Sequence, residues 1–179
     1  MTASDDAATL RLERDLFLRL LELGDVDDLP PVLEGALALI VELTGATRGY
    51  LELRGRGGEP FSIAHGFTDA ELGDVRQQLS TGILREAIAT GRTLSTASAI
   101  EDPRFSSNAS VQAGRIQAVL CAPIGKEPAL GALYLQGRRA PGPFPEASRA
   151  LAELFAKHLA PLADRAIARE VLAAAADHT

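Results

Sequence analysis

Apolar residues near the N-terminus recur at helical spacing and form two neighbouring stripes. The first stripe consists of Leu12, Leu16, Leu20 and Leu23, and the second of Leu10, Phe17 and Leu21. This spacing predicts a helix over residues 6–23 with an apolar arc wider than one packing partner requires. Either the whole arc packs on the chain's own sheet, or part of it is buried against a second copy of the chain.

The remaining pattern predicts a second helix, two strand hairpins separated by helical and loop segments, and a final helix. The expected ranges are helix 29–43, strands 47–53 and 61–65, helices 69–79 and 82–89, and strands 93–96, 119–124 and 129–136. The final helix is expected to start at Pro145. Pro161 lies inside it and predicts a kink or a break, because proline has no amide proton and its ring crowds the preceding turn. This order favours a central antiparallel sheet with helices packed on it, and not a Rossmann fold.

Composition and charge exclude several classes of function. The chain has 179 residues, and its apolar residues are mostly aliphatic, which fits one domain with an aliphatic core. Residues 1–44 carry a net charge of −7 and the rest of the chain +1, so no basic patch marks a nucleic-acid surface.

The first ten residues lack the charged and apolar regions of a signal peptide. No apolar run approaches the ~20 residues that span a bilayer. We therefore expect a cytoplasmic protein that binds neither membranes nor nucleic acid directly.

The single cysteine, Cys121, lies in the apolar run 118–124. One cysteine excludes an intrachain disulfide and a multi-cysteine zinc site. A cysteine flanked by apolar residues is usually a small buried hydrophobe and not a thiolate. Alternation along the strand places Val119, Cys121 and Pro123 on one face of the sheet, but it does not say which face that is. None of the three histidines has a metal-ligand spacing, so we predict no metal site.

A polar segment over residues 101–117 precedes this strand. Its Asp-Pro and Ser-Ser-Asn-Ala-Ser sequences are typical of turns. Ser106 and its neighbours lack the G-x-S-x-G context of a hydrolase nucleophile. A loop of this length inside a compact domain is uncommon unless it has a function. A plain connecting loop and a lid over a ligand are both consistent with the segment.

Four segments in order resemble the GAF domain family of small-molecule sensors. They are VLEGALALIVELTGATRGYLEL (32–53), STGILREAIATGRTL (80–94), DPRFSSNASVQAGRIQAVLCAPI (102–124), and ALGALYLQGR (129–138) together with FPEASRALAELFAKHLA (144–160). The resemblance covers about residues 27–165. It implies an α+β fold with an antiparallel sheet of five to six strands, terminal helices on one face, and a helix and lid loop on the other.

The resemblance also implies a site and a domain organisation. Its ligand contacts would come from lid residues Phe105, Ser107, Asn108 and Arg115, together with Cys121. The motifs of the cyclic-nucleotide, bilin and multi-cysteine reductase subfamilies are absent, so the ligand or cofactor stays unknown. Residues 1–26 would be a dimerisation helix, 27–165 the sensor domain, and 166–179 a helical extension toward an effector domain.

The function implied is a non-catalytic sensor module that binds a small molecule, forms a homodimer through its terminal helices, or does both. The lid and following strand are most similar to those of bacterial sigma-fifty-four-dependent transcriptional regulators. A sensor histidine kinase or nucleotide cyclase is an alternative parent. A small redox enzyme using Cys121 is a further alternative, although the absence of a resolving cysteine argues against it.

Overall fold

The computed structural model describes residues 3–22, 29–54, 60–68, 72, 82–99, 101–104, 118–125 and 128–176. These residues form helices α1 (Ala3–Glu22), α2 (Leu29–Thr44), α4 (Ile83–Thr90) and α6 (Glu146–Ala176). They also form strands β1 (Ala46–Leu53), β2 (Phe61–His65), β3 (Leu94–Thr96), β4 (Val119–Ile124) and β5 (Gly131–Arg138). The predicted helix over 69–79 lies outside the described residues, apart from Leu72.

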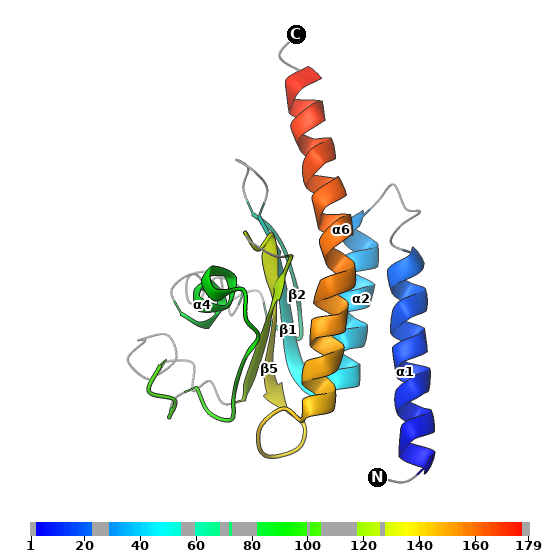
Figure 1. Cartoon of the computed structure of the whole chain (residues 1–179), viewed down its shortest axis with the longest axis vertical. Coiled ribbons are helices and arrows are strands. Elements are labelled where there is room, and N and C mark those ends of the chain that lie inside the picture. Colours follow the sequence, from blue (N-terminus) through cyan, green and yellow to red (C-terminus); the bar gives the residue numbers. More distant parts are fainter. Residues whose placement is uncertain are drawn as a thin grey trace.

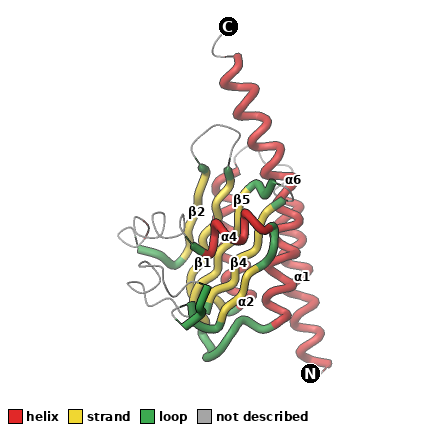
Figure 2. Tube along the Cα trace, turned by 60° about the vertical axis from the view of Figure 1, so that its left-hand side comes forward, coloured by secondary structure: helices red, strands yellow, loops and turns green. Residues whose placement is uncertain are grey.

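The five strands form one antiparallel sheet in the order β2-β1-β5-β4-β3 (Figure 2). This confirms the predicted central antiparallel sheet and the α+β fold class. The two hairpins, β1–β2 and β4–β5, join through the β1–β5 pair at the centre of the sheet. Segments about 80 residues apart in the sequence therefore form its middle.

The helices lie in layers on the two sides of the sheet (Figure 1). Helices α2 and α6 cover one face, and α4 lies on the other. This confirms that the terminal helices share one face. Helix α1 packs on α2 and α6 and not directly on the sheet, so packing of α1 on the sheet itself is wrong. Leu16 and Leu20 of α1 are buried in the core that the terminal helices share.

Helix α6 continues past Pro161 to Ala176, so of the two expected outcomes the break is wrong, and the kink stays a prediction. Pro161 is exposed, and the missing hydrogen bond therefore falls on the solvent side of the helix. Phe155, Leu159 and Ala163 are buried on the opposite side, and their packing continues across the proline. Buried contacts on both sides of Pro161 thus stabilise one continuous helix.

A glycine and a hydroxyl hold the end of α2 against α6. Gly45 adopts φ 68°, the left-handed conformation that ends many helices. The buried Ser148 Oγ of α6 donates a hydrogen bond to the carbonyl oxygen of Thr44 at 3.2 Å. The C-terminal end of α2 is therefore held in place, and this positions β1, which follows after Gly45, against α2.

Candidate functional site

Strand register brings aromatic, polar and thiol side chains into one row across the sheet. Tyr50 of β1 pairs directly with Tyr134 of β5, and Tyr134 pairs with Cys121 of β4. Ala64 of β2 and Leu94 of β3 extend the row at its two ends. All five belong to the apolar cluster that α4 covers. We call this side of the sheet the α4 face.

The rows on either side of it add polar groups to the α4 face. One row is Arg48–Gln136–Val119–Thr96, and the other is Ser62–Glu52–Ala132–Pro123. The opposite face carries a different chemistry on the three central strands. Its buried side chains are Leu51, Leu53, Leu120, Ala122, Ile124, Leu133 and Leu135, all of which pack toward the terminal helices. Polar side chains of the central strands therefore gather on the α4 face.

Both buried phenols make hydrogen bonds along their own strands. The Tyr50 hydroxyl donates to Glu52 Oε2 at 3.3 Å, and the Tyr134 hydroxyl donates to Gln136 Oε1 at 3.4 Å. Arg54 Nε donates to Glu52 Oε1 at 2.7 Å, which compensates the carboxylate of a residue that is only 9% exposed. Buried polar groups are costly when unpaired. These hydrogen bonds therefore offset the cost of burying the polar side chains of the α4 face.

Burial also decides which groups on the α4 face ionise. It raises the pKa of the Tyr134 hydroxyl, and the neighbouring Cys121 raises it further while Arg48 lowers it. Burial likewise raises the pKa of the Cys121 thiol well above its usual value. Both groups are therefore neutral at physiological pH. The face offers hydroxyl hydrogen bonds and apolar contacts, but not a thiolate nucleophile.

Apolar residues of α4 pack over this surface. Ile83, Leu84 and Ala87 are buried against Tyr50, Tyr134 and their neighbours. The helix ends at Gly91, whose φ of 62° is left-handed. At the edge of the cluster, the Arg48 guanidinium lies 5.4 Å from the centroid of the Phe67 ring. The phenols thus lie between an aliphatic helix and a partly polar rim.

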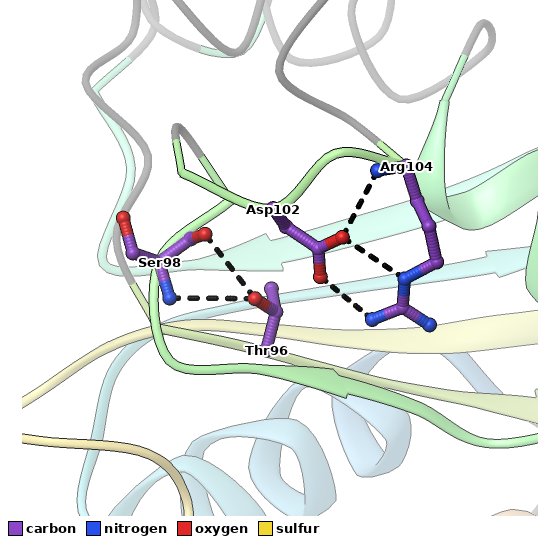
Figure 3. A network of polar contacts seen from close by, with 4 residues as sticks. All are labelled: Thr96, Ser98, Asp102 and Arg104. Atoms are coloured by element: carbon purple, nitrogen blue, oxygen red, sulfur yellow. Dashed lines mark hydrogen bonds and ion pairs between the residues drawn. The ribbon is translucent and has the colours of Figure 1, made fainter.

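A polar network holds the segment that follows β3 (Figure 3). Arg104 donates to Asp102 through its backbone amide at 3.0 Å, through Nε at 3.0 Å and through Nη2 at 2.6 Å. The backbone amide of Ser98 donates to Thr96 Oγ1 at 3.3 Å. The amide of Asp102 donates to the carbonyl oxygen of Ser98 at 3.0 Å. These bonds fix the chain where the predicted lid begins.

Asp102 should contribute to stability in a pH-dependent way. The hydrogen bond from Arg104 lowers the pKa of Asp102 from 3.8 to about 2, although burial opposes the shift. Because the folded pKa is lowered, the stabilisation is present above about pH 4 and is lost as the pH falls toward 2. Arg104 is nearly half-exposed, so we expect Asp102→Asn to cost only about 1 kcal/mol at pH 7.

Urea unfolding at pH 7 and across pH 4 to 2 tests this prediction. The control is Asp15→Asn, which removes the exposed pair between Arg14 and Asp15 and should cost less than about 0.5 kcal/mol. Equal losses for the two variants at pH 7 would contradict the special role of Asp102.

The predicted site residues have different outcomes. Phe105, Ser107, Asn108 and Arg115 lie outside the described residues. Cys121 lies on the α4 face, and the predicted alternation of β4 is confirmed because Leu120, Ala122 and Ile124 are buried on the other face. The two tyrosines and the Glu52–Arg54 pair were not among the predicted site residues. Their spacing of two along the predicted strands was the available signal.

Cys121 should behave as a structural residue. It is fully buried, and its high pKa leaves almost no thiolate at neutral pH. We expect Cys121→Ser to change the free energy of unfolding by no more than about 1.5 kcal/mol, as for a nearly isosteric core change with a hydroxyl penalty. Native alkylation with iodoacetamide should be slow and become fast in urea. Rapid native alkylation with a thiol pKa near 6 would contradict this prediction.

Neither a metal site nor a membrane span is found in the part of the chain that the structure describes. Its histidine, cysteine and acidic side chains form no group of three suited to a metal ion. Its helices include none that is both long enough and apolar enough to cross a bilayer.

The GAF domain family model matches residues 28–161, which is most of the sequence. The chain belongs to the GAF domain family. None of the curated proteins matches it significantly. This GAF domain resembles that of a phosphoenolpyruvate-protein phosphotransferase from Coxiella burnetii, with 20% identity and a TM-score of 0.71 over 91% of this chain and 96% of that one.

Two further solved structures have comparable folds. The GAF domain of a protein described as a sensor histidine kinase from Pseudomonas syringae pv. tomato is 19% identical, with a TM-score of 0.62 over 95% of this chain and 96% of that one. Free methionine-R-sulfoxide reductase from Neisseria meningitidis is 17% identical, with a TM-score of 0.64 over 96% of each chain. At these identities the likeness extends to the fold alone.

Proposed function

We propose that this GAF domain is a non-catalytic regulatory sensor that binds a small, mostly apolar molecule at the α4 face and dimerises through its terminal helices. The observation that carries the proposal is the difference between the two faces of the sheet. The helix-covered face of the central strands is aliphatic. The α4 face carries two phenols, a carboxylate paired with Arg54, a glutamine and an arginine. Ligand sites are typically apolar surfaces with a few placed polar groups.

The residues of the α4 face favour an apolar ligand over a phosphate. Glu52 is compensated by Arg54, and Arg48 lies over the Phe67 ring. The apolar residues at this face include Ile83, Leu84 and Val119, which are buried in the same cluster as the two phenols. A phosphate would require several donors or a helix N-terminus directed at it. Lid residues Phe105, Ser107, Asn108 and Arg115 remain the predicted contacts from the loop side.

The proposal that the domain is non-catalytic rests on Cys121 and its surroundings. The thiol is fully buried, and burial raises its pKa. A nucleophile requires a base within hydrogen-bond reach, whereas the residues paired with Cys121 across the sheet are Leu94 and Tyr134. Tyr134 is itself neutral, so it does not activate the thiol. The redox alternative also lacks a second cysteine in the sequence to resolve an oxidised intermediate.

The parent protein is proposed to be a bacterial signalling protein, with a transcriptional regulator as the specific prediction. That prediction rests on the resemblance of residues 102–124 to sigma-fifty-four-dependent regulators. The structural neighbours described above come from other classes, namely a phosphotransferase, a protein described as a sensor histidine kinase and a methionine sulfoxide reductase. A histidine kinase or nucleotide cyclase parent is the alternative.

Calorimetry tests the predicted ligand class. Cyclic GMP and cyclic AMP should give no binding heat at micromolar protein concentration, because the α4 face offers few groups for a phosphate. Native mass spectrometry of freshly purified protein should instead detect either no ligand or a small apolar one. Micromolar binding of a cyclic nucleotide, or reduction of methionine sulfoxide above the rate of the Cys121→Ser variant, would contradict the proposed function.

Methyl NMR then locates any co-purified ligand after it is stripped and added back. Val119 and Leu120 are neighbours on β4 whose side chains lie on opposite faces. We expect shift changes at the methyl groups of Val119, Ile83 and Leu84 and none at Leu120. Shifts confined to Leu120 and its face would place the ligand elsewhere. Asn108→Ala should weaken binding if the predicted lid contacts the ligand.

A further inference from the structure

Helix α1 has a second apolar stripe that its own chain leaves uncovered. Leu16 and Leu20 are buried against α2 and α6, whereas Leu10 and Leu21 are 64% and 69% exposed. Phe17 is 37% exposed and contacts the His158 ring of α6 edge-on, with centroids 4.8 Å apart. The exposed stripe therefore lies beside α6 and extends for about three turns.

Arg14 completes the stripe at the spacing of a coiled-coil seam. Leu10, Arg14, Phe17 and Leu21 follow one another at intervals of four, three and four residues. Arg14 makes an ion pair with Asp15 of its own helix at 2.8 Å, and both side chains are largely exposed. Such a surface pair contributes little to stability, so the guanidinium can turn to another partner at small cost.

The order of these four residues distinguishes the two ways in which two copies of α1 can pair. In a parallel pair each residue meets its own copy, which places two Arg14 guanidinium groups together at the seam. Like charges facing each other are unfavourable there. In an antiparallel pair with its two-fold axis between Asp15 and Leu16, the seam is self-complementary. Leu10 then meets Leu21, and Arg14 meets the Phe17 ring, which attracts a cation over its face.

We infer that a second copy of this chain binds α1 in antiparallel orientation, with Leu10 against Leu21 of the partner subunit and Arg14 over Phe17 of the partner subunit. This inference rests on the proposed dimerisation and adds the relative orientation of the two α1 helices. Helices α1 and α6 run in the same direction (Figure 1). An antiparallel α1 pair therefore points the C-termini of the two α6 helices in opposite directions. A ligand signal would then reach each effector separately, without passing through a joined pair of α6 helices.

Spin-label distances in the full chain test the orientation. The label is attached at Ala7→Cys in the Cys121→Ser background, because Ala7 is exposed on α1 and precedes the four seam residues. Antiparallel pairing offsets the two labels by about 25 Å along the helix axis, at 1.5 Å per residue. Parallel pairing leaves them only the interaxial distance of about 10 Å apart. A distance of about 25–30 Å supports the inference, and any other interprotomer distance overturns it.

Disulfide formation gives an independent measurement. Leu10→Cys and Leu21→Cys, each in the Cys121→Ser background, change exposed residues and should leave the fold intact. Mixed together, the two proteins should form a covalent dimer, while each alone should not, because like positions lie about 16 Å apart along the axis. Self-crosslinking of either protein alone indicates a parallel pair and overturns the inference. If sedimentation shows only monomer, the proposed dimerisation itself fails, and the inference with it.

Discussion

Replacement of Gly131 by alanine should destabilise the domain by at least about 3 kcal/mol, at the upper end of single substitutions. A Cβ atom at this position would lie 1.9 Å from the carbonyl oxygen of Glu52 and 2.9 Å from its carbonyl carbon. Both atoms belong to the backbone of β1, so no side-chain rotation can relieve the contact. Gly131 pairs with Leu53 in the central β1–β5 ladder, and separating these strands would also displace Tyr134 from Tyr50.

Gly35→Ala is the matched control for this substitution. Gly35 lies in α2, and a Cβ atom there would meet nothing within 4 Å. Because alanine loses less backbone entropy than glycine in a helix, this variant should gain about 0.5–1 kcal/mol. Urea unfolding of both variants beside the parent measures the two free energies. Equal stabilities for Gly131→Ala and the parent would show that the strands separate at little cost.

Local patterns predicted most elements of this fold because helical and strand spacing depend on nearby residues. Strand 61–65 matches β2 and strand 119–124 matches β4, since turn residues bound both. The break expected at Pro161 does not occur because the buried contacts of Phe155, Leu159 and Ala163 hold α6 together across the proline. The position of α1 outside α2 and α6 also depends on contacts between distant segments, which periodicity does not encode.

The candidate site was less predictable for the same reason. Alternation placed Cys121 with Val119 and Pro123, but the face they share depends on where α4 packs. The row that joins Cys121, Tyr134 and Tyr50 exists only through the pairing of β4, β5 and β1. Nothing in either hairpin alone specifies that contact. The resemblance placed the ligand contacts mainly in the lid, whereas the polar groups of the α4 face come from the sheet itself.

If the proposed dimer forms through α1, the substitution Leu21→Glu should abolish self-association. Leu21 is the most exposed of the large apolar side chains described, so a charge there should not disturb the folded monomer. Burial of one leucine contributes roughly 1.5–3 kcal/mol, and a symmetric dimer buries two copies. Replacing both with carboxylates should therefore raise the dimer Kd by at least about 100-fold.

Sedimentation velocity over a range of protein concentrations measures this shift. Ala89→Glu is the control, because it adds the same charge to an exposed position on α4, on the other side of the sheet. A chain lacking residues 1–24 should also be monomeric, but it uncovers the surface against which Leu16 and Leu20 pack, so the point variant is the sharper test. A monomeric parent chain at high micromolar concentration would end the dimer proposal. A dimer that persists in Leu21→Glu and in the truncated chain would place the interface away from α1, because only an interface elsewhere survives both changes.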